Sequence, residues 1–174
     1  MKKEKKRIGI LGGTFDPAHK GHVEISKEAK KKFKLNKVFW AITKKNPFKN
    51  QSLIDLKKRI SLAKKLNIKN RFIKVSFYEK KIKSNRTIDL IKYFKKKYKY
   101  SDLFLIIGAD NLINFHKWRN YKKITKYCKI LVFDRTNYRS KSLKSISYKK
   151  ISKRELEFIK FNKVNISSSK LRKI

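Results

Sequence analysis

Residues 8–22 read IGILGGTFDPAHKGH and contain four of the five glycines of the chain. Just before and within this stretch, Arg7–Leu11 predicts a short buried strand, and Val23–Phe33, with apolar residues at helical spacing, predicts the helix that follows. Between them, glycine allows positive φ angles and close approach of the backbone. We therefore expect a strand, a tight glycine loop and a helix, with the loop folded around a bound group.

The composition is that of a globular chain. The chain has 174 residues, of which 40% are apolar and 36% are charged, and a chain of this size buries roughly two-thirds of its unfolded surface without disulfides or metals. We expect one domain over residues 1–174. The single cysteine, Cys128, lies in an apolar stretch and is expected to pack as a small buried hydrophobe, which fits a reducing compartment.

The N-terminus is basic, like the start of an export signal, but the apolar run after it ends at Gly12-Gly13. No apolar run in the sequence approaches the roughly 18–20 residues that span a bilayer. These two features predict a cytoplasmic protein without a membrane partner.

The chain carries 51 Lys and Arg against 12 Asp and Glu, a formal net charge of +39. Basic surfaces bind nucleic acid by displacing counterions from its phosphates. The lysines here are spread evenly, and the enrichment in Lys, Ile, Asn, Phe and Tyr is what A/T-rich codons encode, so compositional drift is the preferred explanation. We expect only non-specific contact with nucleic acid, and an attraction for substrates that carry several phosphates.

The remaining apolar runs predict four more strands, at Lys37–Thr43, Phe72–Phe77, Leu103–Ile107 and Lys129–Phe133. Segments with apolar residues at helical spacing predict helices at Leu53–Leu66 and Thr87–Tyr98. Strands that are apolar on both faces and alternate with helices predict a doubly wound α/β fold, with a mostly parallel sheet in three α/β/α layers. Arg135–Ser152 has no periodicity and is interpreted as an exposed loop.

In such sheets, ligands bind beyond the carboxyl ends of the strands, and both Gly12-Gly13 and Gly108 stand there. Amides of a glycine loop converge on an anion, and the following helix has a partly positive N-terminus. His19 and His22 are three residues apart, so both imidazoles face the same side where the helix begins. This pattern predicts a phosphate site held in part by the two histidines.

Other ligand loops fit less well. Two histidines at this spacing suggest zinc, but Asp16 is the only further ligand type at suitable spacing, so we disfavour zinc. A Walker phosphate loop needs Lys-Ser/Thr after its last glycine, and a dinucleotide loop needs three spaced glycines. The sequence matches neither of these loops.

The stretch from Gly12 to His22 resembles the first motif of the His-x-x-His nucleotidylyltransferases, and Ile166–Arg172 resembles their second motif. The resemblance implies a Rossmann-like fold in which both motifs converge on ATP. It implies that the ATP-binding residues of the two motifs are Gly12, Gly13, Thr14, Phe15, His19, His22, Ser168, Ser169 and Arg172. The physical chemistry agrees, because serines at a helix start offer amides and hydroxyls and arginine forks onto phosphate oxygens.

Three further segments, residues 46–49, 87–90 and 107–118, resemble bacterial nicotinate-nucleotide adenylyltransferase. The resemblance implies that Gly108 and Asp110 hold the ribose of ATP, and that a pyridine mononucleotide is bound by Lys49, Thr87 and Trp118. An aromatic ring suits a flat pyridine. Without this resemblance, Trp118 would be interpreted as a partly buried core residue and Asp110 as a helix cap.

The sequence departs from the family pattern at three places. Ser169 stands where threonine is usual, which keeps the hydroxyl. Phe48 stands where many relatives have histidine, so one polar substrate contact is expected to be absent. Arg135 matches a family arginine, but the Pro-Gly usually near it is missing.

The resemblance implies transfer of AMP from ATP to nicotinate mononucleotide, which gives nicotinate adenine dinucleotide and pyrophosphate in NAD biosynthesis. His22 and His19 are expected to stabilise charge on the phosphoryl oxygens. Mg²⁺ is expected to be carried by the phosphates, because carboxylates near the loop are too few for an all-protein site.

Alternative functions are phosphopantetheine adenylyltransferase of coenzyme A biosynthesis, which usually has threonine at the position of His19, and a basic nucleic-acid-binding protein on the same fold. The sequence leaves open the acid or amide form of the pyridine and a monomer or homodimer.

Overall fold

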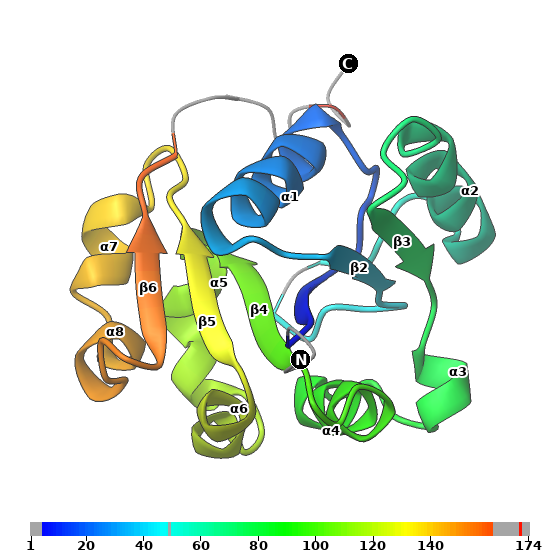
Figure 1. Ribbon diagram of the computed structural model, residues 1–174. Helices are drawn as coiled ribbons and strands as arrows, with labels where there is room; N and C mark the ends of the chain where they lie inside the picture. Colours follow the sequence, from blue (N-terminus) through cyan, green and yellow to red (C-terminus); the bar gives the residue numbers. More distant parts are fainter. Residues whose placement is uncertain (1–4, 49, 162–170, 172–174) are drawn as a thin grey trace.

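The computed structural model describes residues 5–48, 50–161 and 171, and within them six strands form one sheet in the order β3-β2-β1-β4-β5-β6, in which every pair is parallel (Figure 1). The strands are β1 Arg7–Gly13, β2 Lys37–Ile42, β3 Ile73–Ser76, β4 Asp102–Gly108, β5 Lys129–Phe133 and β6 Leu156–Ile159. The central pair is β1 and β4. The order reverses between them, as in a doubly wound fold.

The helices in the described residues are α1 Lys20–Phe33, α2 Leu56–Leu66, α3 Glu79–Ile82, α4 Thr87–Lys97, α5 Ala109–Asn114, α6 Tyr121–Tyr127, α7 Arg139–Leu143 and α8 Ile146–Lys150, with a 3₁₀ turn η1 at Phe115–Lys117. Helix α2 begins three residues later than the pattern predicts. Its N-cap is Asp55, whose side chain accepts a hydrogen bond from the Lys58 amide.

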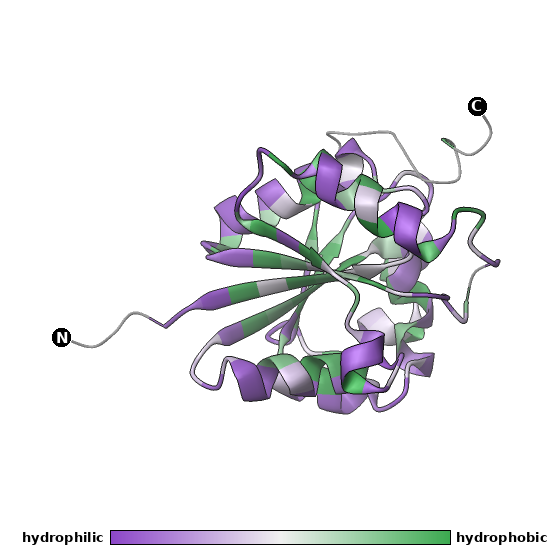
Figure 2. Cartoon of the chain, turned by 90° about the vertical axis from the view of Figure 1, so that its right-hand side faces the viewer, coloured by the Kyte–Doolittle hydropathy of each residue, from purple (hydrophilic) through white to green (hydrophobic). Residues whose placement is uncertain are grey.

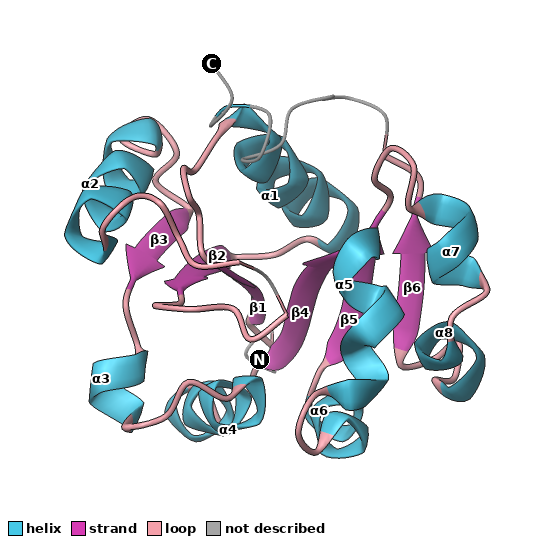
Figure 3. Ribbon diagram, turned by 180° about the vertical axis from the view of Figure 1, so that it is seen from behind, coloured by secondary structure: helices cyan, strands magenta, loops and turns pink. Residues whose placement is uncertain are grey.

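Alternate residues of the strands pack on opposite faces of the sheet. In β4, Leu105 and Ile107 join a core covered by α4, α5 and α6, whereas Phe104 and Ile106 join a core covered by α1 and α2. Figure 2 shows the apolar sheet between two layers of helices, and Figure 3 shows α5 in front of the sheet when it is seen from behind. The predicted three-layer α/β/α fold is thus confirmed.

The interpretation of Arg135–Ser152 as an exposed loop is wrong. This segment contains α7 and α8, and the Ser142 and Ser147 side chains are fully buried. The Ser147 hydroxyl accepts a hydrogen bond from the His116 amide at 2.9 Å, and the Ser142 hydroxyl donates to the Arg139 carbonyl at 2.8 Å. Buried serines share this packing with Tyr148 and Ile151, so the segment shows little hydrophobic periodicity.

Candidate active site

A cleft of about 1360 Å³ opens at the carboxyl ends of β1 and β4, where the strand order reverses. The predicted site residues that line it are Gly12, Gly13, Thr14, Phe15, His19, His22, Thr87, Gly108, Asp110 and Trp118. The structure therefore brings together every predicted site residue that it describes. Lys49, Ser168, Ser169 and Arg172 lie outside the described residues.

His19 and His22 form a reciprocal cap at the start of α1. His19 is the N-cap and its Nδ1 accepts a hydrogen bond from the Gly21 amide at 3.1 Å, while Nδ1 of His22 accepts from the His19 amide at 3.2 Å. The two ring centroids are 3.9 Å apart. Helix capping thus fixes the two imidazoles beside each other, as the three-residue spacing predicts.

The capping hydrogen bonds also fix which ring nitrogens carry protons. A neutral imidazole has one acceptor nitrogen and one N–H donor. Because Nδ1 is the acceptor in both rings, the neutral form of each ring carries its proton on Nε2. Burial is the larger cause, and the positive charge of Arg135 the smaller one, that together lower the pKa of His19 to about 4. His19 is therefore a neutral donor at pH 7.

The low pKa of His19 predicts a loss of stability in acid. In the unfolded chain the pKa is near 6.5, so from about pH 6.5 down to about 4 the unfolded state binds a proton that the folded state does not. Stability therefore falls as the pH falls through this window. His19→Asn keeps a capping acceptor without this titration. We expect thermal unfolding to show a larger drop in Tm for the unmodified protein than for His19→Asn between these pH values, whereas equal drops would contradict the assignment.

Buried aromatic rings pack behind His22. The Phe15 ring lies 4.8 Å from the His22 ring and stacks on Trp40, also with 4.8 Å between centroids. Trp40 Nε1 donates to the Ser26 hydroxyl, which in turn donates to the His22 carbonyl, both at 2.8 Å. The Phe15 side chain is thus part of the core, and this residue can offer a nucleotide only its backbone.

The glycines of the site matter because they have no side chain that would fill space near the backbone, and not because they adopt positive φ angles. Among the described residues no glycine has a positive φ, and the positive φ in the loop belongs to Phe15, at 48°. That part of the sequence interpretation is wrong. A Cβ at Gly12 would meet nothing within 4 Å and would project into open space at the cleft, whereas a Cβ at Gly13 would meet the Phe15 ring at 3.5 Å. The backbone at Gly12 is thus accessible to a ligand.

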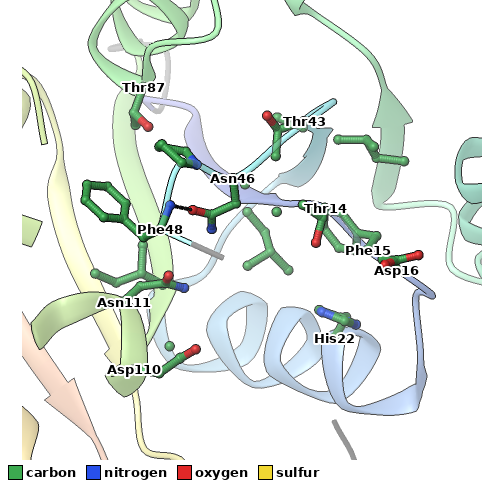
Figure 4. A pocket seen from close by; sticks show the side chains of 18 of the residues that line it. Thr14, Phe15, Asp16, His22, Thr43, Asn46, Phe48, Thr87, Asp110 and Asn111 are labelled. Carbon is green, nitrogen blue, oxygen red and sulfur yellow. Dashed lines mark hydrogen bonds between the residues drawn. The ribbon is translucent and has the colours of Figure 1, made fainter. Parts of the chain in front are cut away.

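Asp110 lies in the first turn of α5, across the cleft from Thr14 and His22 (Figure 4). Its side chain is 10% exposed, and Oδ2 accepts from Arg135 Nη1 at 2.7 Å. A Cβ at Gly108 would stand 2.5 Å from Asp110 Oδ1, so only glycine leaves room for this carboxylate. The glycine after β4 thus serves the placement of Asp110.

Gly108→Ala is therefore expected to displace Asp110 with little effect on the fold, because the obstructing atom ends a side chain. Displacement of a substrate-positioning group by about 1 Å costs roughly 10²-fold in rate. Steady-state kinetics should show a loss of this order in kcat/KM, and circular dichroism should show an unchanged fold. Full activity would mean that the carboxylate position is irrelevant.

The far side of the cleft presents Thr87, Trp118 and the segment that follows β2 (Figure 4 shows Thr87). Thr87 opens α4. Trp118 is the C-cap that follows η1, and its ring lies 5.0 Å from that of Phe115 in the core. Trp118 is thus both the partly buried core aromatic and a lining residue. The Asn46 side chain accepts from the Phe48 amide at 2.9 Å, and Phe48 is 47% exposed.

Sequence reasoning gave no role to two lining residues. Arg135 pairs with Asp110 and follows β5, whose carboxyl end lies at the same edge of the sheet as the cleft. That position after a strand was the signal from which a role in the site could have been predicted. Tyr78 follows β3 and was not singled out, and burial raises its pKa to about 12. It also packs on Tyr93 of α4, with 5.7 Å between ring centroids.

Among the described residues, no three His, Cys, Asp or Glu side chains stand close enough to hold a metal ion. The carboxylates near the loop have other partners: both oxygens of Asp16 accept backbone amides, and Asp110 pairs with Arg135. Within the same residues, no helix has the length and apolar character needed to cross a membrane.

Comparison with known proteins agrees with this geometry. The cytidylyltransferase-like family matches residues 10–174. "Probable nicotinate-nucleotide adenylyltransferase" of Pelagibacter ubique (strain HTCC1062) is 62% identical over 174 residues, which is 100% of this chain and 96% of that protein. The protein of the same name from Bradyrhizobium sp. (strain ORS 278) is 38% identical over 130 residues, covering 74% of this chain and 67% of that protein.

A solved structure shares the fold. "Plasmodium falciparum nicotinic acid mononucleotide adenylyltransferase complexed with NaAD" superposes with a TM-score of 0.72 at 20% identity, over 97% of this chain and 83% of that one. The chain belongs to the cytidylyltransferase-like family and, within it, to the nicotinate-nucleotide adenylyltransferases.

Proposed function

We propose that this chain transfers AMP from ATP to nicotinate mononucleotide, giving nicotinate adenine dinucleotide and pyrophosphate in NAD biosynthesis. The observation that carries the proposal is that the glycine loop with its histidine pair and the residues Thr87 and Trp118 line one cleft. The full-length similarity to a nicotinate-nucleotide adenylyltransferase supports the same reaction.

The chemistry needs positioning and charge stabilisation. A phosphate oxygen of the mononucleotide attacks the α-phosphorus of ATP, a new P–O bond forms, and the bond to the β-phosphate oxygen breaks with its electrons passing to pyrophosphate. The nucleophile is already ionised, so no protein group has to remove a proton. His19 and His22 then donate from Nε2 to the α-phosphate oxygens, which gain charge in the transition state.

Each of the two substrates, ATP and nicotinate mononucleotide, has proposed binding residues in the cleft. Asp110, held beside Arg135, would accept hydrogen bonds from the ribose of ATP. The Trp118 ring would pack on the pyridine. Arg86 at the N-cap of α4 makes no side-chain hydrogen bond to the helix, so the first amides beside Thr87 suit the carboxylate of nicotinate. This arrangement favours the acid over the amide.

Four assignments stay predictions because the residues lie outside the described ones. Ser168, Ser169 and Arg172 are proposed to hold the outgoing pyrophosphate, and Lys49 to contact the mononucleotide. Mg²⁺ is proposed to enter on the phosphates of ATP, where it would neutralise part of their charge. This proposal is supported by two carboxylates that line the cleft, because Asp16 is engaged by backbone amides and Asp110 by Arg135.

The test is pyrophosphate release from ATP and Mg²⁺, with nicotinate mononucleotide, nicotinamide mononucleotide and phosphopantetheine offered separately. We expect turnover with nicotinate mononucleotide and a lower kcat/KM with the amide. Turnover with phosphopantetheine alone would replace the proposal with its coenzyme A counterpart. Silence with all three would reject adenylyl transfer to any of these acceptors.

A further inference from the structure

Arg59 of α2 is only 2% exposed, and its guanidinium donates to main-chain carbonyls of three different segments. Nη1 donates to the carbonyl of Thr14 at 2.6 Å and to that of Thr43 at 2.9 Å. Nη2 donates to the Lys44 carbonyl at 3.1 Å, and Nε to the Ile54 carbonyl at 2.9 Å. One side chain thus joins the glycine loop, the end of β2 and the entry to α2.

Asp16 makes the complementary connection from the glycine loop. It is 2% exposed, and its carboxylate oxygens accept from the amides of Leu53 and Ile54, both at 2.9 Å. The segment that enters α2 is therefore held by an anion of the loop and by the Arg59 cation. Both contacts are to main-chain atoms, so they fix the path of the backbone.

Burying the Arg59 guanidinium costs desolvation free energy, which a purely structural contact could avoid. Burial lowers the pKa of Arg59 from its ordinary value, while the carboxylates of Asp16, Asp55 and Glu79 raise it. Apolar residues of similar volume often stabilise a core as well as a buried charge network does. What the guanidinium adds is a planar set of donors in fixed directions.

The joined segments leave the neighbouring strands β1 and β2 and line different parts of the cleft. Thr14 belongs to the loop that lines the ATP side, and Thr43 and Lys44 lead into the segment that contains Asn46 and Phe48 (Figure 4). The carbonyls of Thr14 and Thr43 share one nitrogen of Arg59, just beyond the point where the Thr43 amide donates to the Gly13 carbonyl at 2.9 Å, so Arg59 extends the contact between the two segments past the paired strands. In-line transfer depends on such separations, since a 1 Å error costs roughly 10²-fold.

We propose that Arg59 is a positioning residue that sets the distance between the ATP loop and the loop that receives the second substrate. The proposal rests on the proposed function for its kinetic consequence. The structural part, a fixed separation of two loops, stands on the contacts of Arg59 and Asp16 alone.

Arg59→Lys tests the proposal, because a single ammonium cannot reach four carbonyls in three segments. The matched control is Ala63→Gly, one turn further along α2 and fully buried, which weakens the helix without touching either loop. We expect Arg59→Lys to lower kcat by roughly 10²-fold with KM for ATP changed by less than about threefold. Ala63→Gly should lower Tm and leave kcat within about threefold.

Hydrogen exchange of the same variants gives a readout that needs no turnover. We expect faster exchange of the Leu53 and Ile54 amides in Arg59→Lys, with the amides in the middle of α2 still protected. If Arg59→Lys does not fold, Asp16→Asn takes its place, because it weakens the same connection and keeps Arg59. For this variant too we expect a lower kcat and faster exchange of the Leu53 and Ile54 amides.

The positioning role is overturned if the unmodified protein turns over nicotinate mononucleotide and Arg59→Lys has the same kcat and the same amide exchange. A loss of kcat that merely follows Tm in both variants overturns it too. Silence of the unmodified protein would instead reject the proposed function, and exchange would still decide the role of Arg59.

Discussion

His22→Ala is expected to lower kcat by about 10²–10³-fold, the cost of removing one preorganised donor from a developing oxyanion. The ring is fixed by its contact with the His19 amide and by the aromatic packing of Phe15 behind it. Because the donor acts on charge that grows in the transition state, KM should change much less than kcat. Steady-state kinetics with ATP and nicotinate mononucleotide measure both.

The matched control is His116→Ala. His116 lies in η1, contacts the Ser147 hydroxyl at 3.1 Å and is not one of the residues that line the cleft. It should keep kcat within about threefold, even if Tm falls. A folded His22→Ala protein with less than a tenfold loss would exclude the proposed role of His22 in charge stabilisation.

Gly12→Ala is expected to reduce kcat/KM by about 10²-fold without harm to the fold. The new methyl group would meet no protein atom within 4 Å, so it would occupy the space in which a phosphate must approach the loop amides. Kinetics and thermal unfolding of the same preparation separate the two effects. We expect Tm to stay within about 2–4 °C.

Gly9→Ala provides the reverse control on the same strand. Its Cβ would stand 2.9 Å from Leu35 Cδ1 and 3.1 Å from Ile106 Cδ1, both inside the core. It should lower Tm and leave KM unchanged in the protein that remains folded. If Gly12→Ala kept full activity, the loop backbone would not be where phosphate binds.

The parts of the fold with a hydrophobic pattern could be predicted from the sequence. The β4 and β5 runs are apolar on both faces, which is typical of a parallel sheet covered on both sides, and both strands lie where the pattern places them. Cys128 was predicted to be buried, and it is 5% exposed with its pKa raised by burial to about 12. The histidine spacing also predicted the shared face of the pair, which the caps at α1 confirm.

The parts held by polar groups could not be predicted. Arg59 stands among lysines in α2, and a cation in a basic helix indicates a solvated face, yet this side chain is buried on four carbonyls. Asp16 was considered only as a metal ligand, but it accepts from the backbone amides of Leu53 and Ile54, just before α2. Such roles depend on which backbone carbonyls and amides the fold brings near, and sequence spacing does not encode that.

The most direct measurement of the central claim follows the α-phosphate of ATP. The protein is incubated with nicotinate mononucleotide, Mg²⁺ and ATP labelled at the α-phosphate or, separately, at the γ-phosphate, with His22→Ala as the blank. We predict that the α label appears in nicotinate adenine dinucleotide and the γ label in pyrophosphate, both slowed strongly in the variant. Retention of the α label in ATP or its release as free AMP, with no dinucleotide formed, would contradict the account.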